Sequence, residues 1–209
     1  MGLGRFYNDN VLPLIVEKAC SAPGVMRLRP KATDALFGTV VEIGFGAGPN
    51  VEFYPATVER VLAVEPSELS RHRAMRRIGR RPIDVEFVGI DGERLPLDDD
   101  VADSALVTFT LCTIPDVDAA LAELRRVLKP KAPLFALEHG LAPDARVARL
   151  QRRLTPIQRR VAGGCHLDRD PVALLTAAGF TDLKVSQQYL RSTPKFIGYT
   201  SLISATSPD

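Results

Sequence analysis

The 209-residue sequence contains no tryptophan and only three cysteines, Cys20, Cys112 and Cys165. Three cysteines, an odd number, do not indicate a disulfide framework, and no two of these lie at the C-x-x-C spacing of a zinc ribbon. We therefore expect no disulfide scaffold and no metal site, and a reducing cytoplasm fits this composition. The sequence also lacks a run of eighteen apolar residues and the basic start and apolar stretch of a signal peptide, so we expect neither a spanning helix nor export.

An excess of charge of one sign is also missing. The 27 Lys and Arg residues nearly balance the 25 Asp and Glu residues, for a formal net charge of +2. That excess is too small to indicate a nucleic-acid-binding protein, and no aromatic residues alternate with the arginines as a single-strand platform requires. Hydrophobic residues at 45% and charged residues at 25% are typical of one globular domain at this length.

The order of apolar patterns predicts an α/β domain. From residue 39 on, short β-branched segments alternate with helical ones, which is typical of βαβ units and a parallel sheet. The predicted strands are 39–43, 60–64, 85–88, 104–110 and 134–138, followed by a terminal pair at 181–187 and 198–205, and the predicted helices include 50–55, 67–77, 116–128 and 170–178. We divide the single domain, 1–209, into an N-terminal helical cover (1–38), a cofactor-binding core (39–140), a substrate-side insertion (141–179) and a terminal strand pair (180–209).

Three glycines, Gly44, Gly46 and Gly48, follow the first predicted strand at alternate positions. Glycine permits a tight turn and a close approach of ligand to backbone, and a helix beginning after the loop offers unpaired N–H groups. The spacing is G-x-G-x-G, which differs from the G-x-G-x-x-G of dinucleotide-binding folds. Taken alone, the triplet is weak evidence for a cofactor.

Polar residues stand at the ends of the next predicted strands, where open α/β sheets bind ligands. Glu65 follows the second strand and could accept hydrogen bonds from both ribose hydroxyls, and Asp91 follows the third and could take an adenine amino group. Thr110 and Leu111 end the fourth strand, and His139 ends the fifth. The alternative is that the acids cap helices and satisfy loop N–H groups in a domain without a cofactor.

The order of these motifs resembles the class I S-adenosylmethionine-dependent methyltransferases over residues 35–140. The matching stretches are the glycine loop at 40–48, Glu65-Pro66, the third-strand segment 91–97, the fourth strand at 103–115 and its helix at 124–130. The resemblance implies a three-layer, Rossmann-like, seven-stranded sheet that is mostly parallel with an antiparallel last strand, and S-adenosylmethionine as cofactor. The predicted cofactor-binding residues are Tyr7, Glu42, Gly44, Gly46, Gly48, Asn50, Glu65, Pro66, Asp91, Gly92, Thr110 and Leu111.

A narrower resemblance, to methyltransferase-like proteins whose mammalian members are membrane-associated alkyl thiol methyltransferases, covers nearly the whole chain from Tyr7. It is carried by the segments 48–50, 53–55, 110–113, 138–139 and 164–169. It implies a small-molecule methyl acceptor, with a thiol as the first expectation and a phospholipid amine or quinone-like ring as the next. The hydrophobic N-terminal anchor of the mammalian members is not seen in this sequence. An NAD(P)-dependent oxidoreductase and a binding module without activity are the alternatives.

His139 is the candidate catalytic residue, because it ends the strand expected to border the transferred methyl group; the alternative is a loop-fixing histidine. Cys112 is interpreted as a small buried side chain, and Cys165 and His166 as lid packing. The arginines at 71–81 and 146–160 are interpreted as solvated helix faces, with contact to an anionic membrane surface or an anionic substrate as the alternative. Nothing in the pattern predicts the oligomeric state.

Overall fold

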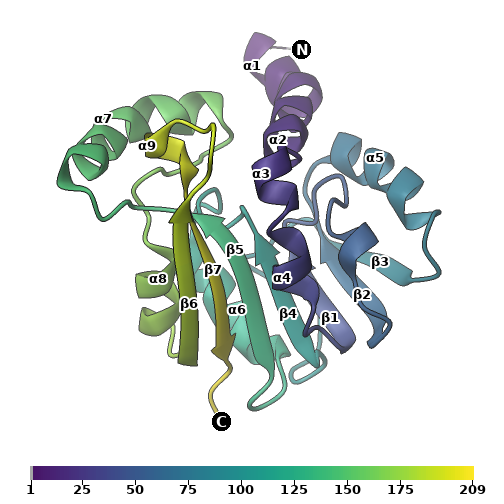
Figure 1. Cartoon of the computed structure of the whole chain (residues 1–209). Coiled ribbons are helices and arrows are strands. Elements are labelled where there is room, and N and C mark those ends of the chain that lie inside the picture. Colours follow the sequence, from purple (N-terminus) through teal and green to yellow (C-terminus); the bar gives the residue numbers. More distant parts are fainter. Residues whose placement is uncertain (1) are drawn as a thin grey trace.

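The computed structural model describes residues 2–209, which form one seven-stranded sheet with helices on both faces (Figure 1). The strand order is β3-β2-β1-β4-β5-β7-β6. The strands are β1 (Gly38–Ile43), β2 (Val58–Val64), β3 (Asp84–Gly89), β4 (Ser104–Thr108), β5 (Pro133–His139), β6 (Thr181–Tyr189) and β7 (Tyr199–Thr206). Strands β1 to β5 are parallel, and β7 is antiparallel to both β5 and β6. The predicted fold class is confirmed, including the antiparallel last strand.

Helices bury the two faces of the sheet in two separate apolar layers. The helices and helical turns of the chain are α1 (Leu3–Phe6), the π-helical η1 (Tyr7–Val11), α2 (Leu12–Cys20), α3 (Pro23–Met26), α4 (Arg29–Thr33), the 3-10 turn η2 (Val51–Phe53), α5 (Glu68–Ile78), α6 (Val117–Val127), α7 (Ala145–Val161), α8 (Pro171–Ala177) and α9 (Lys195–Gly198). Leu121 of α6 and Leu175 of α8 pack on one face, and Ala32 of α4 and Ala74 of α5 pack on the other. Each face of a buried parallel sheet needs such a cover, since both faces are apolar.

Local sequence explains where most helices begin. The Asp116 side chain accepts the N–H of Ala119 and so caps α6, and Asp170 accepts the N–H groups of Val172 and Ala173 ahead of Pro171. In the N-terminal segment, Pro23 and Pro30 lie in the first turns of α3 and α4 rather than only interrupting a longer helix.

One predicted element is wrong and one is too long. The helix expected at 50–55 is only the 3-10 turn η2, because Tyr54 precedes a proline and adopts an extended backbone (ψ 129°). The strand expected to run to residue 110 ends at Thr108, because Phe109 has a φ of 54°. The glycine loop therefore leads into no long helix, and residues 109–113 form a turn.

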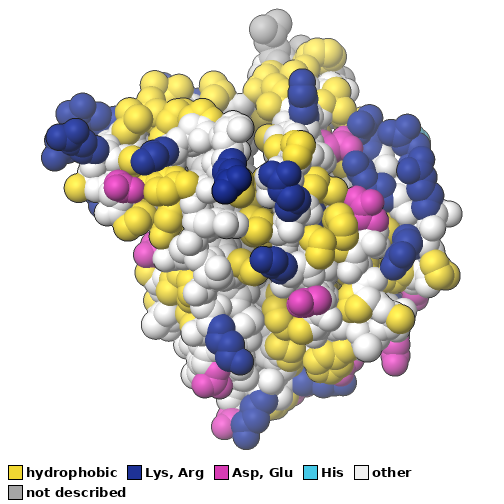
Figure 2. All heavy atoms as spheres, in the orientation of Figure 1, with side chains coloured by type: hydrophobic (Ala, Val, Ile, Leu, Met, Phe, Trp, Pro, Cys, Tyr) yellow, Lys and Arg dark blue, Asp and Glu magenta, His cyan; other side chains and the backbone are white. Residues whose placement is uncertain are grey.

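The carboxyl ends of the strands are flanked by α2 on one side and by α7 on the other (Figure 1). Helix α4 lies on β5 and β7, whereas α1 and α2 extend beyond the sheet and expose Phe6, Leu14 and Ile15. Figure 2 shows Lys and Arg side chains gathered over α5 and at one end of α7. Within residues 2–209, no helix combines the length and apolar character needed to cross a bilayer.

Candidate cofactor site

A cleft of about 1230 Å³ opens at the carboxyl ends of β1, β2 and β4. This is the switch point of the sheet, because the chain continues from β1 to β2 on one side and reaches β4 on the other. Seven of the predicted cofactor residues line it: Gly44, Gly46, Glu65, Pro66, Asp91, Gly92 and Thr110. Residues of η1, α2 and the loop after α7, including Asn8, Glu17 and Gly163, complete the wall.

The three glycines of the loop meet three different requirements. A Cβ on Gly44 (φ 79°) would lie 1.9 Å from the Thr110 Oγ1 atom, so Gly44 lets the loop pack against the turn after β4. Gly46 (φ 59°) faces open space, and its N–H donates to Glu65. Gly48 (φ 72°) packs inward against Phe45 and does not line the cleft. Positive φ makes glycine the favoured residue at all three positions.

Glu65 is the charged centre of the cleft. Its Oε2 atom accepts the N–H of Gly46 at 2.8 Å, and its Oε1 atom accepts the N–H of Ser67 at 2.8 Å. A carboxylate has about four lone-pair directions, so two remain for a ligand. Burial raises the pKa of Glu65 above its ordinary value, although the hydrogen bonds from Ser67 and Gly46 oppose that shift. Ser67 then caps α5 by accepting the N–H of Ser70 at 3.2 Å.

Glu42 and Asn50 lie beneath the glycine loop and not in the cleft. Both are 0% exposed, and Asn50 Nδ2 donates to Glu42 Oε1 at 2.7 Å. The Tyr54 hydroxyl donates to the other oxygen of Glu42. Burial raises the pKa of Glu42 to about 7. These two predicted cofactor residues therefore support the loop from below.

Arg29, which the sequence reasoning missed, completes that buried network. Its guanidinium donates to Asn50 Oδ1 at 2.6 Å, to Thr108 Oγ1 at 3.3 Å and to the Cys20 carbonyl at 2.8 Å. The side chain is 1% exposed and also borders the cleft. The only local signal was an arginine directly before Pro30, which is compatible with an ordinary surface position. Burial lowers the pKa of Arg29, and the nearby Cys20 and Glu42 oppose that shift.

Two further supports hold the walls of the cleft. The Arg77 guanidinium donates to the Ala47 carbonyl at 2.7 Å and to Glu17 at 3.0 Å, so part of the arginine-rich stretch 71–81 fastens α2 and the glycine loop rather than facing solvent alone. Glu138 Oε1 accepts the N–H groups of Thr110 at 2.7 Å and Leu111 at 3.1 Å. Burial raises the pKa of Glu138 to about 7. Leu111 is buried in this turn and does not reach the cleft.

Asp91 and Gly92 form the far side of the cleft, after β3. The Asp91 carboxylate is exposed, and its Oδ1 atom accepts the N–H of Glu93 at 2.9 Å, which orders the turn. A Cβ on Gly92 would lie 2.8 Å from Ile43 Cγ2, so glycine lets this turn lie against β1. The remaining oxygen of Asp91 is available to a ligand.

Tyr7 and His139 do not line the cleft. The Tyr7 hydroxyl donates to the Val161 carbonyl at 2.7 Å, which joins η1 to the end of α7. His139 is stacked on Phe109, a cleft residue, with ring centroids 6.4 Å apart, and its Nε2 atom lies 3.2 Å from Cys165 Sγ. The catalytic role of His139 stays a prediction.

Comparison with known proteins matches residues 41–136 to the methyltransferase domain family. The thiol S-methyltransferase TMT1B of Rattus norvegicus is 32% identical over 154 residues, which are 72% of this chain and 63% of the relative. The demethylmenaquinone methyltransferase of Thermobifida fusca is 35% identical over 114 residues, which are 54% of this chain and 48% of the relative. The chain thus spans about three fifths of the length of the thiol methyltransferases that it matches.

The solved structure of Haemonchus contortus phosphoethanolamine N-methyltransferase 2 in complex with S-adenosyl-L-methionine has the same fold. It matches with a TM-score of 0.70 at 12% identity and covers 100% of this chain and 61% of that chain. The strand order and the cleft at the switch point are consistent with the methyltransferase domain that the sequence matches. In its matched domain and its relatives, this chain is similar to the class I S-adenosylmethionine-dependent methyltransferases.

Proposed function

We propose that this protein binds S-adenosylmethionine in the cleft and transfers its methyl group to a small-molecule thiol. The observation that carries the cofactor assignment is the Glu65 carboxylate, which two backbone N–H groups hold beside Gly46 at the cleft surface. In this orientation it offers its free lone pairs to a ribose diol. We assign Gly46, which faces open space in the cleft, to the amino acid part of the cofactor, and Asp91, on the far side of the cleft, to the adenine.

Methyl transfer from a sulfonium is an in-line displacement, so the protein has mainly to align the nucleophile with the methyl carbon and exclude water. As the acceptor sulfur attacks, its bond to the methyl carbon forms while the bond from that carbon to the cofactor sulfur breaks. The thiol proton is lost before or during attack, and S-adenosylhomocysteine leaves. A free thiol has a pKa of about 8.5, so a site that favours the thiolate would speed the reaction.

The thiol acceptor is supported by the thiol S-methyltransferase relatives, which align with 72% of this chain. A quinone-like ring is the second candidate, because the demethylmenaquinone methyltransferase relative is 35% identical over a shorter stretch. The dinucleotide alternative has no comparable support: the G-x-G-x-G loop is followed by a 3-10 turn and not by the helix that binds a pyrophosphate.

The acceptor is tested by incubating the purified chain with S-adenosylmethionine and a panel of an alkyl thiol, a reduced quinone analogue and an amine. The readouts are S-adenosylhomocysteine and the methylated product by mass spectrometry. We expect turnover with the alkyl thiol. Turnover with only the quinol would overturn the acceptor and keep the reaction class, whereas binding of NAD and not of S-adenosylmethionine would overturn both.

A further inference from the structure

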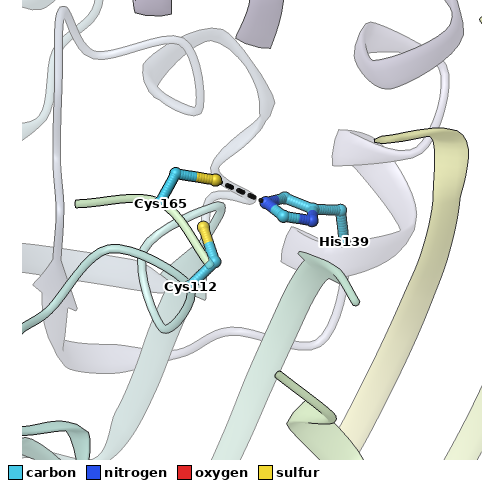
Figure 3. A group of neighbouring side chains, drawn as sticks. All are labelled: Cys112, His139 and Cys165. Carbon is cyan, nitrogen blue, oxygen red and sulfur yellow. Dashed lines mark hydrogen bonds between the residues drawn. The ribbon is translucent and has the colours of Figure 1, made fainter. Parts of the chain in front are cut away.

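Three side chains outside the cleft form a compact group of metal-binding type. Cys112 comes from the turn after β4, His139 from the end of β5 and Cys165 from the loop between α7 and α8 (Figure 3). Their donor atoms all lie within 4.8 Å of one another, and Cys165 Sγ lies 3.2 Å from His139 Nε2. Both cysteines are free thiols. We call these three residues the Cys-His-Cys cluster.

The spacing of the donors fits one tetrahedral ion. Zinc binds thiolate sulfur at about 2.3 Å and imidazole nitrogen at about 2.0–2.1 Å. Donor atoms around such an ion lie roughly 3.5–3.8 Å apart, by the geometry of a tetrahedron with those bond lengths. The cluster therefore closes around an ion with side-chain shifts of about 1 Å or less. By contrast, no two of the donors are close in the sequence, which is why cysteine spacing alone predicted no metal site.

The surroundings favour a soft cation over other ligands. Cys112 and Cys165 are buried together with Leu167, and Leu154 and Ala162 pack around them. Two thiolates neutralise the charge of a divalent ion, so the ion adds no net charge to this apolar region. The Nε2 atom of His139 faces Cys165 Sγ, and an imidazole protonated on its buried Nδ1 atom presents the Nε2 lone pair to an ion.

Taken together, we propose that Cys112, His139 and Cys165 bind one Zn²⁺ ion. The test of this proposal does not depend on the methyl-transfer reaction, and the proposal gives His139 a structural role in place of the predicted catalytic one. In the metal-free chain, the hydrogen bond with Cys112 and then burial raise the pKa of the Cys165 thiol, so zinc must displace that proton when it binds.

The site links the segment after α7 to the sheet. Gly164 and Thr113 are the direct neighbours of Cys165 and Cys112, and both line the cleft. An ion between the two cysteines would therefore hold the α7–α8 loop against the ends of β4 and β5. Three protein ligands leave a fourth position, which water or an added thiol can fill.

The first test is a Zn²⁺ titration of the reduced, metal-free full-length chain under anaerobic conditions. A chromophoric chelator competes for the metal and reports the free Zn²⁺. We expect one Zn²⁺ per chain and a higher melting temperature with zinc than without it. Co²⁺ in place of Zn²⁺ should give thiolate-to-cobalt charge-transfer absorption. Failure of the wild-type chain to bind either ion, or cobalt binding without that absorption, would overturn the proposal whatever the outcome of the methyltransferase assay.

The matched variants are Cys112→Ser, Cys165→Ser and, as control, Cys20→Ser, which removes a thiol outside the cluster. We expect each cluster variant to lose on the order of 100-fold or more in zinc affinity, since even indirect supports of a metal site contribute 10–100-fold, and the control to keep it. Where a variant fails to fold, the wild-type chain is alkylated with and without Zn²⁺ and analysed by mass spectrometry. We expect bound zinc to protect Cys112 and Cys165 from alkylation. Equal alkylation of both with and without zinc would contradict the site.

Discussion

The carboxylate of Glu65 accepts the backbone N–H of Gly46 at 2.8 Å and so ties the end of β2 to the glycine loop after β1. The same carboxylate accepts the N–H of Ser67 at the start of α5. One side chain thus joins three segments around the cleft. Because two of its lone pairs remain free, the group that orders the loop is also the group placed to hold a ligand.

Replacing Glu65 should weaken cofactor binding. For Glu65→Gln we expect a loss of about 1.5–3 kcal/mol, or roughly 10- to 150-fold, because hydrogen bonds to a charged acceptor are lost. Isothermal titration calorimetry with S-adenosylmethionine and S-adenosylhomocysteine measures this loss of affinity. Glu52→Gln is the control, since Glu52 is exposed on η2 and outside the cleft. Equal affinities for the wild type and the Glu65 variant would remove Glu65 from the site.

Cofactor affinity should depend on pH through Glu65. The ionised form accepts the ribose hydroxyls, and burial raises the pKa of Glu65 above the ordinary value. Affinity is therefore highest above that raised pKa, and falls as the pH drops through it, at a higher pH than for an ordinary glutamate with a pKa of about 4.3. Titrations from pH 8 downward should show the decline in the wild type and a flatter profile in Glu65→Gln. Parallel profiles would contradict the assignment.

Two glycine substitutions should separate stability from binding. Gly44→Ala places a methyl group 1.9 Å from Thr110 Oγ1 at a φ of 79°, so we expect a loss of about 2–5 kcal/mol in the free energy of unfolding. Gly46→Ala meets open space at a φ of 59°, so we expect only about 1–2 kcal/mol. Its methyl group projects into the cleft and should lower cofactor affinity. Urea denaturation and calorimetry measure the two effects, and an unfolding midpoint lower for Gly46→Ala than for Gly44→Ala would show the packing assignment to be wrong.

The buried Glu42 should make the fold less stable as the pH rises. Its pKa is about 7 in the folded chain, above that of an exposed glutamate, so the folded state holds a proton that the unfolded state has released. The stabilisation is complete below the unfolded pKa of about 4.3 and is lost as the pH rises through about 7. Glu42→Gln should therefore show a smaller fall in melting temperature between pH 5 and pH 8 than the wild type.

Part of this dependence should survive in the Glu42 variant, because burial also raises the pKa of Glu138 to about 7. Glu59→Gln, an exposed change on β2, serves as control and should behave like the wild type. Identical slopes for wild type and Glu42→Gln would mean that Glu42 does not titrate in this range.

Local sequence was sufficient to predict the helices and strands whose apolar pattern and ends are set by neighbouring residues. The β-branched segments predicted β1 to β5 within a few residues, and Asp116 marked the start of α6. Residues at the strand ends, mainly glycines and acids, predicted seven of the residues that line the cleft, because parallel strands bring their carboxyl ends to one edge. Where a single backbone angle decided the outcome, as at Phe109, the pattern gave no warning and the predicted strand was too long.

Tertiary structure alone decided which distant residues meet. The α7–α8 loop packs on the ends of β4 and β5, where the His166 N–H donates to the Cys112 carbonyl and the Leu141 N–H to the Arg169 carbonyl. This packing brings Cys165 beside His139. Arg29 joins Asn50 and Thr108 only because α4 packs against the sheet. Glu42 and Asn50 were predicted to bind the cofactor, yet both side chains are buried beneath the loop and support it instead. Sequence periodicity shows which face of an element is apolar. Contacts between residues far apart in the chain depend on how all the helices and strands pack together.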